Sequence, residues 1–176
     1  ERVQIALPED FELPAGGLNI RWPDGILEQE ARLVNYKWYA ALAYARANKL
    51  NRLIWDSPKP RFGILTAGKS YLDTRQALED LGIDEAVARD IGLRLYKVGM
   101  TWPLEPQGVR GFAEGLEEIL VVEEKRQVLE YQLKEELYNW RDDVRPRVVG
   151  KFDDTGEWSN TNRAGHGDWL LPGTYE

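Results

Sequence analysis

The sequence predicts an α/β fold with a largely parallel sheet covered by helices on both faces. Three observations lead to this prediction. Short apolar runs alternate with helix-like stretches over most of the chain after residue 51. The stretches between the runs are long enough for the crossover connections that parallel strands require. Finally, 176 residues with 43% hydrophobic side chains can bury a sizeable core.

The first 50 residues predict an irregular arm followed by a long helix. Residues 1–25 contain LPED, LPAGG and RWPDG, whose prolines and glycines favour turns over regular structure. Residues 27–50 lack Gly and Pro and are rich in Ala and Leu, which favours a helix of about six turns. Apolar residues at three- and four-residue spacings form one stripe, which requires a partner surface: Leu27, Ala31, Val34, Trp38, Leu42 and Ala45.

The next hundred residues predict five strands separated by helices. The expected strands are 52–56, 61–68, 93–100, 117–125 and 145–152, and the expected helices are 70–82, 84–92, 106–116 and 126–140. Ser70 and Asp73 have the spacing of a capping box for the first of these helices, which Gly82 ends. Glu130 and Lys134 are spaced to pair on the solvent side of the last one.

Composition divides the chain into three parts. We expect residues 1–51 to form an arm and a helix that pack on the core, and residues 52–153 to form the α/β domain. Residues 154–176 are rich in Gly, Asn and Thr and predict a loop-rich tail.

Charge and cysteine content exclude several classes of function. The chain has no cysteine, which excludes disulfides, thiolate metal sites and protein-ligated iron-sulfur clusters from it. The net charge of -7 argues against binding to nucleic acid, which requires clustered basic residues. No apolar run is long enough for a membrane span, and the first residues do not have the pattern of a secretory signal. We expect a cytoplasmic protein, and a chain that is part of a longer one.

Residues 63–70, GILTAGKS, match the phosphate-loop pattern of nucleotide hydrolases. In a working loop the strand ends before the first Gly, because the four variable residues must wrap around the phosphates. Here the apolar residues Ile64, Leu65 and Thr66 lie inside the motif, and two prolines precede it. We therefore expect these three residues to form a strand, and a nucleotide hydrolase is the less favoured reading.

The carboxyl ends of the predicted strands define a candidate contact surface. In an open α/β sheet, ligands and partners meet the edge at which the parallel strands end. The amides at the start of the helix near Ser70 can also attract an anion, so an anion-binding regulatory module is an alternative function. The candidate rim residues are Gly68, Lys69, Ser70, Trp102, Glu123, Glu124 and Lys125.

Other candidates for chemistry are weaker. His166, the only histidine, lies between glycines with no fixed acid or nucleophile, and a surface role is favoured. The pairs Asp142-Asp143 and Asp153-Asp154 lack the spacing of a calcium loop. By exclusion, we expect no catalytic residue, no cofactor site and no metal site in this chain.

Long strings of this sequence resemble the fused bacterial form of the indolepyruvate ferredoxin oxidoreductase family. They are LPAGGLNIRWPDGILEQEARL, RFGILTAGKSYLDTRQALEDLGID, IGLRLYKVGMTWPLEPQGVRGFAEGLEEILVVEEKRQVLEYQLKEELYN and RPRVVGKFDDTGEW. The resemblance is to the family's middle domain, which has the fold of a transketolase C-terminal domain. It implies a three-layer domain with five strands, of which only the first, RLIWD, runs opposite to the others. The residues SNTNRAGHGD interrupt the family pattern, which leaves no role implied for His166.

The resemblance also implies a function for the longer enzyme. Such an enzyme uses thiamine diphosphate with Mg²⁺ to decarboxylate an arylpyruvate or related 2-oxoacid, passes electrons through iron-sulfur clusters to ferredoxin, and forms an acyl-CoA. This chain lacks a Gly-Asp-Gly motif with a downstream Asn and lacks cluster-binding cysteines. Both belong to other domains, so the resemblance implies a non-catalytic docking domain whose partners are the rest of the same chain, in a homo-oligomeric parent enzyme.

Overall fold

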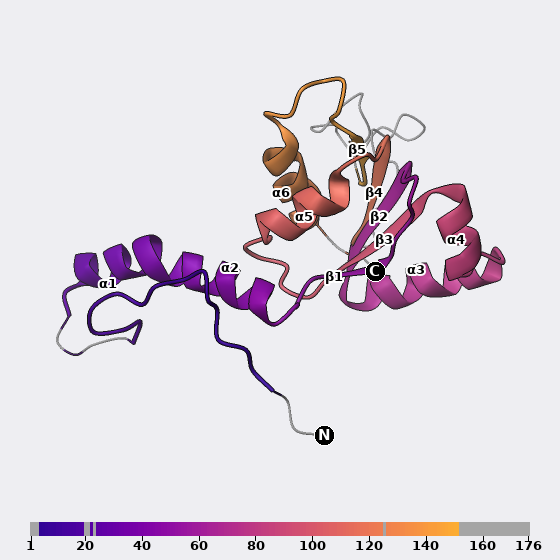
Figure 1. Ribbon diagram of the computed structural model, residues 1–176. Helices are drawn as coiled ribbons and strands as arrows, with labels where there is room; N and C mark the ends of the chain where they lie inside the picture. Colours follow the sequence, from indigo (N-terminus) through magenta and orange to yellow (C-terminus); the bar gives the residue numbers. More distant parts are fainter. Residues whose placement is uncertain (1–3, 20–21, 23, 125, 152–176) are drawn as a thin grey trace. The chain divides into compact units, whose positions relative to one another are not determined.

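The computed structural model describes residues 4–19, 22, 24–124 and 126–151 (Figure 1). The chain divides into two compact units, Glu1–Leu50 and Asn51–Glu176. Lys125, the pair Asp153-Asp154, His166 and the predicted tail of residues 154–176 lie outside the described residues.

The first unit contains the predicted long helix in three consecutive segments. They are α1 (Ile26–Arg32), a π-helical segment η1 (Leu33–Lys37) and α2 (Trp38–Ala47). The predicted apolar stripe is covered at only one end, because Leu42 and Ala45 are buried whereas the Leu27 side chain is 78% exposed. Neither α1 nor η1 contains a buried residue. The amino-terminal half of the stripe is therefore an open apolar surface on this unit.

The arm before the helix is held by polar contacts. The Asn48 side chain accepts from the amide of Ala6 at 2.9 Å and donates to its carbonyl oxygen, also at 2.9 Å. Arg46 pairs with Asp10, with Nε 2.9 Å from Oδ2. These side-chain contacts hold the turn-rich arm against the end of α2. They take the place of the regular backbone hydrogen bonds that the arm lacks.

The second unit is built on a five-stranded sheet with the order β1-β3-β2-β4-β5. Only β1 is antiparallel to its neighbour, so the topology that the resemblance implied is confirmed. β2 occupies the centre and pairs with both β3 and β4, which explains its run of fully buried residues. The strands are β1 (Arg52–Trp55), β2 (Phe62–Ala67), β3 (Leu93–Val98), β4 (Glu118–Val122) and β5 (Arg147–Val149).

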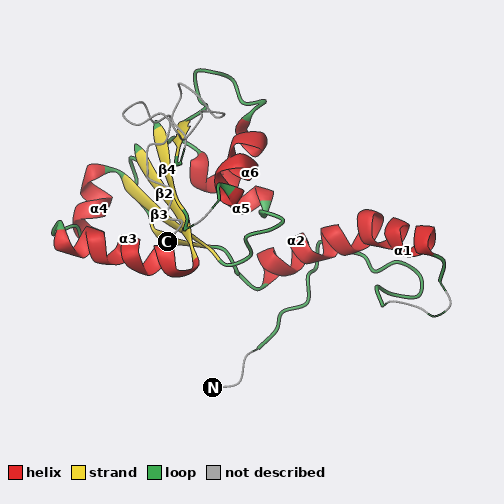
Figure 2. Cartoon of the chain, turned by 180° about the vertical axis from the view of Figure 1, so that it is seen from behind, coloured by secondary structure: helices red, strands yellow, loops and turns green. Residues whose placement is uncertain are grey.

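Helices cover both faces of the sheet, as predicted (Figure 2). One core cluster joins α3 and α4 to the sheet through Leu78 and Ala88, and the other joins α5 and α6 through residues such as Phe112 and Leu133. Because β3 and β4 lie on opposite sides of β2, crossovers of one hand place the helices on opposite faces. The helices are α3 (Gly68–Asp80), α4 (Glu85–Ile91), α5 (Pro106–Ala113) and α6 (Val128–Leu137).

The helix ends confirm some sequence signals and correct others. Asp84 caps α4 by accepting from the amide of Val87, and Gly92 ends it with a left-handed φ of 88°. The predicted capping box at Ser70 is wrong, because α3 begins two residues earlier and Ser70 lies buried in its first turn. The strand leads into the helix without an intervening loop, so no position remains for Ser70 outside the helix.

Glu130 also differs from the prediction. It pairs with Lys134 as expected, with 3.0 Å between Nζ and Oε1, but its side chain is completely buried. Its other oxygen, Oε2, accepts from the amide of Lys151 at 2.9 Å. Gly150 permits this approach, since a Cβ there would lie 2.5 Å from Oε2. The chain after β5 therefore covers what would otherwise be the solvent side of α6.

Over the residues that the structure describes, we find no helix that combines the length and apolarity needed to cross a membrane.

Candidate functional site

The parallel strands end together at one edge of the sheet. Ala67 of β2 is in register with Val98 of β3, and Thr66 is in register with Val122 of β4. The segments that follow these strands hold the predicted rim residues. β2 and β4 flank the point where the direction of the crossovers reverses, which is the usual ligand crevice of an open α/β sheet.

The motif with the phosphate-loop spelling contains a strand, as predicted. β2 includes Gly63 and continues to Ala67, and α3 begins at the next residue. Gly63 has a packing role, because a Cβ there would lie 2.6 Å from Leu116 Cδ1 and 2.7 Å from Phe112 Cζ. Gly68 has a φ of 55°, which permits the direct turn from strand to helix. No loop remains within residues 63–70 that could wrap around a phosphate chain.

Lys69 and Ser70, the last two residues of the motif, already have interactions within α3. Lys69 Nζ lies 2.7 Å from Asp73 Oδ2, one turn along α3. This hydrogen bond raises the pKa of Lys69, and the charge of Glu124 adds to the effect. The Ser70 side chain is buried, and its carbonyl oxygen accepts from the Thr74 hydroxyl at 2.7 Å. Neither side chain is presented as a dedicated anion ligand.

Glu123 caps the helix that follows β4. Its carboxylate accepts from three consecutive amides at the start of α6, those of Val128, Leu129 and Glu130, at 2.9, 2.9 and 3.2 Å. Burial raises the pKa of Glu123, while these hydrogen bonds oppose the shift. The residue therefore performs a structural task that its position at the rim did not reveal.

Trp102 is an exposed hydrophobic residue of the rim, with 60% exposure. It follows β3 in a loop whose first amides, those of Gly99 and Met100, donate to Asn51 Oδ1 at 2.9 and 3.1 Å. Asn51 precedes β1, and because β1 is antiparallel its start lies at this same edge. The loop is thus fixed to the sheet while Trp102 stays accessible.

A second capping glutamate, Glu105, lies close to this edge. It is buried and accepts from the amides of Gln107 and Gly108 at the start of α5. Burial raises the pKa of Tyr96 to about 12, and the nearby charge of Glu105 contributes. The sequence carried a signal for this cap, since a Glu before a Pro fits the position before a helix start. Glu123 had no such signal, because it caps a helix that begins five residues later.

The structure thus brings the described rim segments to one edge of the sheet. Among the described residues, no cluster of three or more Asp, Glu or His side chains is suited to hold a metal ion. The negative charge of Glu124 acts on Lys69, which is already paired with Asp73.

Comparison with known proteins identifies close sequence relationships. A family model described as the indolepyruvate ferredoxin oxidoreductase middle domain matches residues 51–175. The indolepyruvate oxidoreductase subunit IorA of Pyrococcus horikoshii is 32% identical over 116 residues, which is 66% of this chain and 14% of that protein. The corresponding subunit of Pyrococcus abyssi is 34% identical over the same shares, and that of Thermococcus kodakarensis is 35% identical over 45% of this chain and 11% of the relative. The chain thus spans about one seventh of the length of the Pyrococcus relatives.

Two solved structures also show similarity. One is an inactive β4 tetramer of a split-gene transketolase, with 18% identity, a TM-score of 0.40, and coverage of 61% of this chain and 33% of that chain. The other is the 2-oxoglutarate:ferredoxin oxidoreductase of Magnetococcus marinus, with 17% identity, a TM-score of 0.40, and coverage of 70% of this chain and 18% of that chain.

Proposed function

The chain belongs to the indolepyruvate ferredoxin oxidoreductase middle-domain family, and on this premise we propose that it is a docking domain without a catalytic centre of its own. The longer enzyme oxidatively decarboxylates an arylpyruvate or related 2-oxoacid to an acyl-CoA and reduces ferredoxin. Thiamine diphosphate, Mg²⁺ and the iron-sulfur clusters bind to other domains of that enzyme. Its cytoplasmic location and homo-oligomeric state remain predictions.

The open apolar surface of the first unit is the observation that carries the docking role. α1 and η1 bury none of their residues, and Ile26, Leu27 and Val34 are 84%, 78% and 57% exposed. Contiguous apolar surface of this kind is uncommon on a soluble domain that works alone, and it marks sites of association. We infer that another part of the parent enzyme covers it.

The chain does not fit thiamine diphosphate. The sequence has no Gly-Asp-Gly motif, and β2 passes into α3 without a loop that could hold a diphosphate. At the crevice where such a group would enter, the carboxylate of Glu123 already occupies the first amides of α6. Binding of the cofactor therefore falls to the rest of the enzyme.

The three-part division remains part of the proposal. Residues 1–51 supply the arm and the exposed helix, residues 52–153 the sheet domain with its rim, and residues 154–176 a tail. In this arrangement the rim is a second contact surface, on which Trp102 and Glu124 are exposed.

Calorimetry on the 176-residue chain tests the proposal. Titration with thiamine diphosphate and Mg²⁺ should give no binding, while the full-length enzyme binds in the same buffer. Titration with ATP and Mg²⁺ should also give none, and Lys69→Ala should leave this result unchanged. Magnesium-dependent binding of thiamine diphosphate by the chain at micromolar concentration would show that it carries a cofactor site.

A further inference from the structure

A continuous row of cations and aromatic rings lies between α3 and the edge strand β1. Lys97 Nζ lies 4.6 Å from the centre of the Tyr71 ring, and the Tyr71 hydroxyl accepts from Arg75 Nη1 at 3.2 Å. The Arg75 guanidinium lies 4.8 Å from the centre of the Trp55 ring. These four residues, from β3, α3 and β1, form what we call the α3–β1 strip.

The fold brings the strip together from three elements. Lys97 points to the α3 face of the sheet because side chains alternate along β3 and Leu95 belongs to the core on that face. Tyr71 and Arg75 are one turn apart on α3, beside its buried row of Ser70, Thr74 and Leu78. Arg52 lies directly opposite Lys97 in the register with β1 and adds positive charge at the same end.

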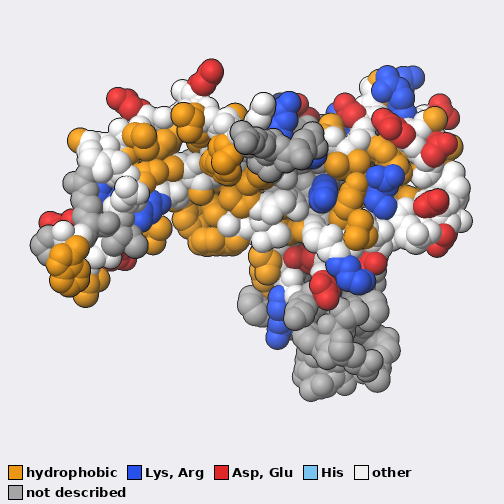
Figure 3. Space-filling model, turned by 90° about the horizontal axis from the view of Figure 1, so that it is seen from below, with side chains coloured by type: hydrophobic (Ala, Val, Ile, Leu, Met, Phe, Trp, Pro, Cys, Tyr) orange, Lys and Arg blue, Asp and Glu red, His pale blue; other side chains and the backbone are white. Residues whose placement is uncertain are grey.

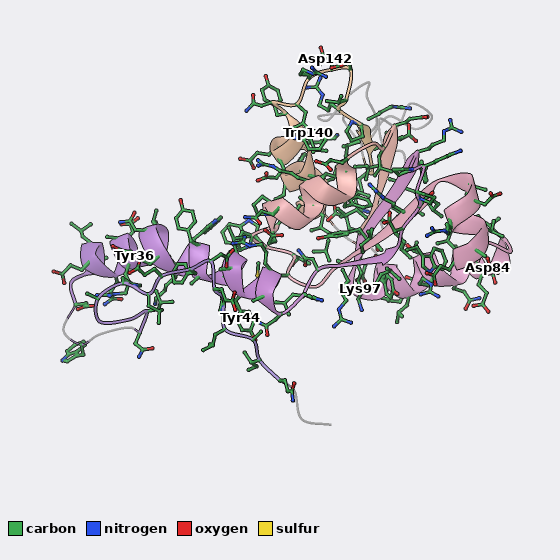
Figure 4. The ribbon with its side chains drawn as sticks, in the orientation of Figure 1. Tyr36, Tyr44, Asp84, Lys97, Trp140 and Asp142 are labelled. Carbon is green, nitrogen blue, oxygen red and sulfur yellow. The ribbon has the colours of Figure 1, made fainter. Side chains whose placement is uncertain are left out.

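The strip is open to contact at its other three residues, whereas Trp55 is buried. Arg75 is exposed, Lys97 and Tyr71 are half-buried, and Leu72, next to Arg75 on α3, is 64% exposed. Figure 3 looks from the side on which α3 lies in Figure 1 and shows hydrophobic side chains next to basic ones; Figure 4 labels Lys97 beside α3. The rings hold the two cationic groups in place, so a partner's carboxylates would meet cations that are already ordered.

The opposite end of the strip carries negative charge. Trp55 and Arg75 line a pocket of about 480 Å³ together with three carboxylates, those of Glu79, Asp84 and Glu85. A nucleic acid or polyphosphate laid along the strip would meet these carboxylates, and the net charge of -7 would repel it at long range. A protein segment can match both ends, because its charge can change sign along its length.

We propose that the α3–β1 strip is a docking site for a protein segment that carries carboxylates, followed by a basic residue. The carboxylates bind at Lys97 and Arg75, the basic residue binds at the pocket, and apolar side chains of the segment contact Tyr71 and Leu72. This inference names the chemistry of one docking surface and so rests on the docking role proposed above.

Fluorescence anisotropy with the 176-residue chain tests the inference. The probe is a labelled synthetic peptide of four glutamates, two leucines and two lysines, so that it carries all three kinds of side chain in the proposal. We expect binding that weakens as salt rises, and a loss of affinity of about tenfold or more in Arg75→Glu. The matched control Arg141→Glu, which reverses an exposed arginine outside the strip, should leave the affinity within about twofold. Lys97→Gln removes a positive charge without reversing it, and it should also weaken binding. This variant tests the inference if Arg75→Glu fails to fold.

Three results would overturn the inference. The peptide does not bind, or it binds to Arg75→Glu and Lys97→Gln with the same affinity as to the wild type. The third is that single-stranded DNA or polyphosphate binds more tightly than the peptide and competes with it. None of these results requires thiamine diphosphate to bind, so failure of the strip and failure of the proposed function can be told apart.

Discussion

At the residue scale, two residues at the candidate site, Gly63 and Glu123, have structural roles. Gly63, the first residue of the phosphate-loop spelling, gives room to Leu116 and Phe112. Glu123, at the crevice, caps α6. In both cases the surroundings decide the role, and those surroundings come from distant parts of the sequence.

Gly63→Ala tests the packing role. The added methyl group must displace the ends of two buried side chains, which should destabilise the fold by about 1–3 kcal/mol. Urea unfolding measures the change. Gly111→Ala in α5 is the matched control: a Cβ there meets nothing within 4 Å, so it should be neutral or stabilising by about 0.5–1 kcal/mol. Unchanged stability of Gly63→Ala would contradict the packing of β2 against α5.

Glu123→Gln tests the half-buried cap of α6. Because burial raises the pKa of Glu123 in the folded state, the native protein holds this proton more tightly than the unfolded chain. Its contribution to stability is therefore greatest below the unfolded pKa, about 4.3, and is lost as pH rises through the raised folded value. In urea unfolding, the free energy of unfolding of the wild type minus that of Glu123→Gln should be larger at pH 4.5 than at pH 7. If this difference between the wild type and the variant grew as pH rises, it would contradict the raised pKa of Glu123.

At the scale of elements, the α/β alternation, the strand positions and the cap of α4 could all be predicted from the sequence. Local signals carried them: the apolar runs, Asp84 and Gly92. The burial of Glu130 could not be predicted, because it depends on Lys151, 21 residues away. The sequence predicted that the rim segments share an edge of the sheet. It did not predict that Lys69 pairs with Asp73 or that Glu123 caps α6.

The arm provides a prediction for an element. Asn48 joins it to α2 through both backbone groups of Ala6, so Asn48→Ala should free the arm and leave the sheet intact. Limited proteolysis should cut the residue 4–19 segment faster in this variant, with an unchanged melting temperature of the chain. Asn35→Ala, at an exposed position of η1, is the control. Equal cleavage rates in the two variants would show that the arm is held by other contacts.

At the scale of the whole molecule, the two units present different kinds of surface. The sheet unit has two buried hydrophobic clusters, which pack its helices on the sheet. The first unit leaves most of its apolar helix stripe exposed. We propose that such a chain stands between other domains of a larger enzyme, which supply the chemistry.

Hydrogen–deuterium exchange tests this central claim most directly, by comparing the 176-residue chain with the full-length enzyme. In the full-length enzyme, amides of α1 and η1 should exchange at least about tenfold more slowly, because a covered helix opens less often. Amides of β2, already at the centre of the sheet, should exchange at similar rates in both. Equal exchange of α1 and η1 in the two proteins would contradict the docking role.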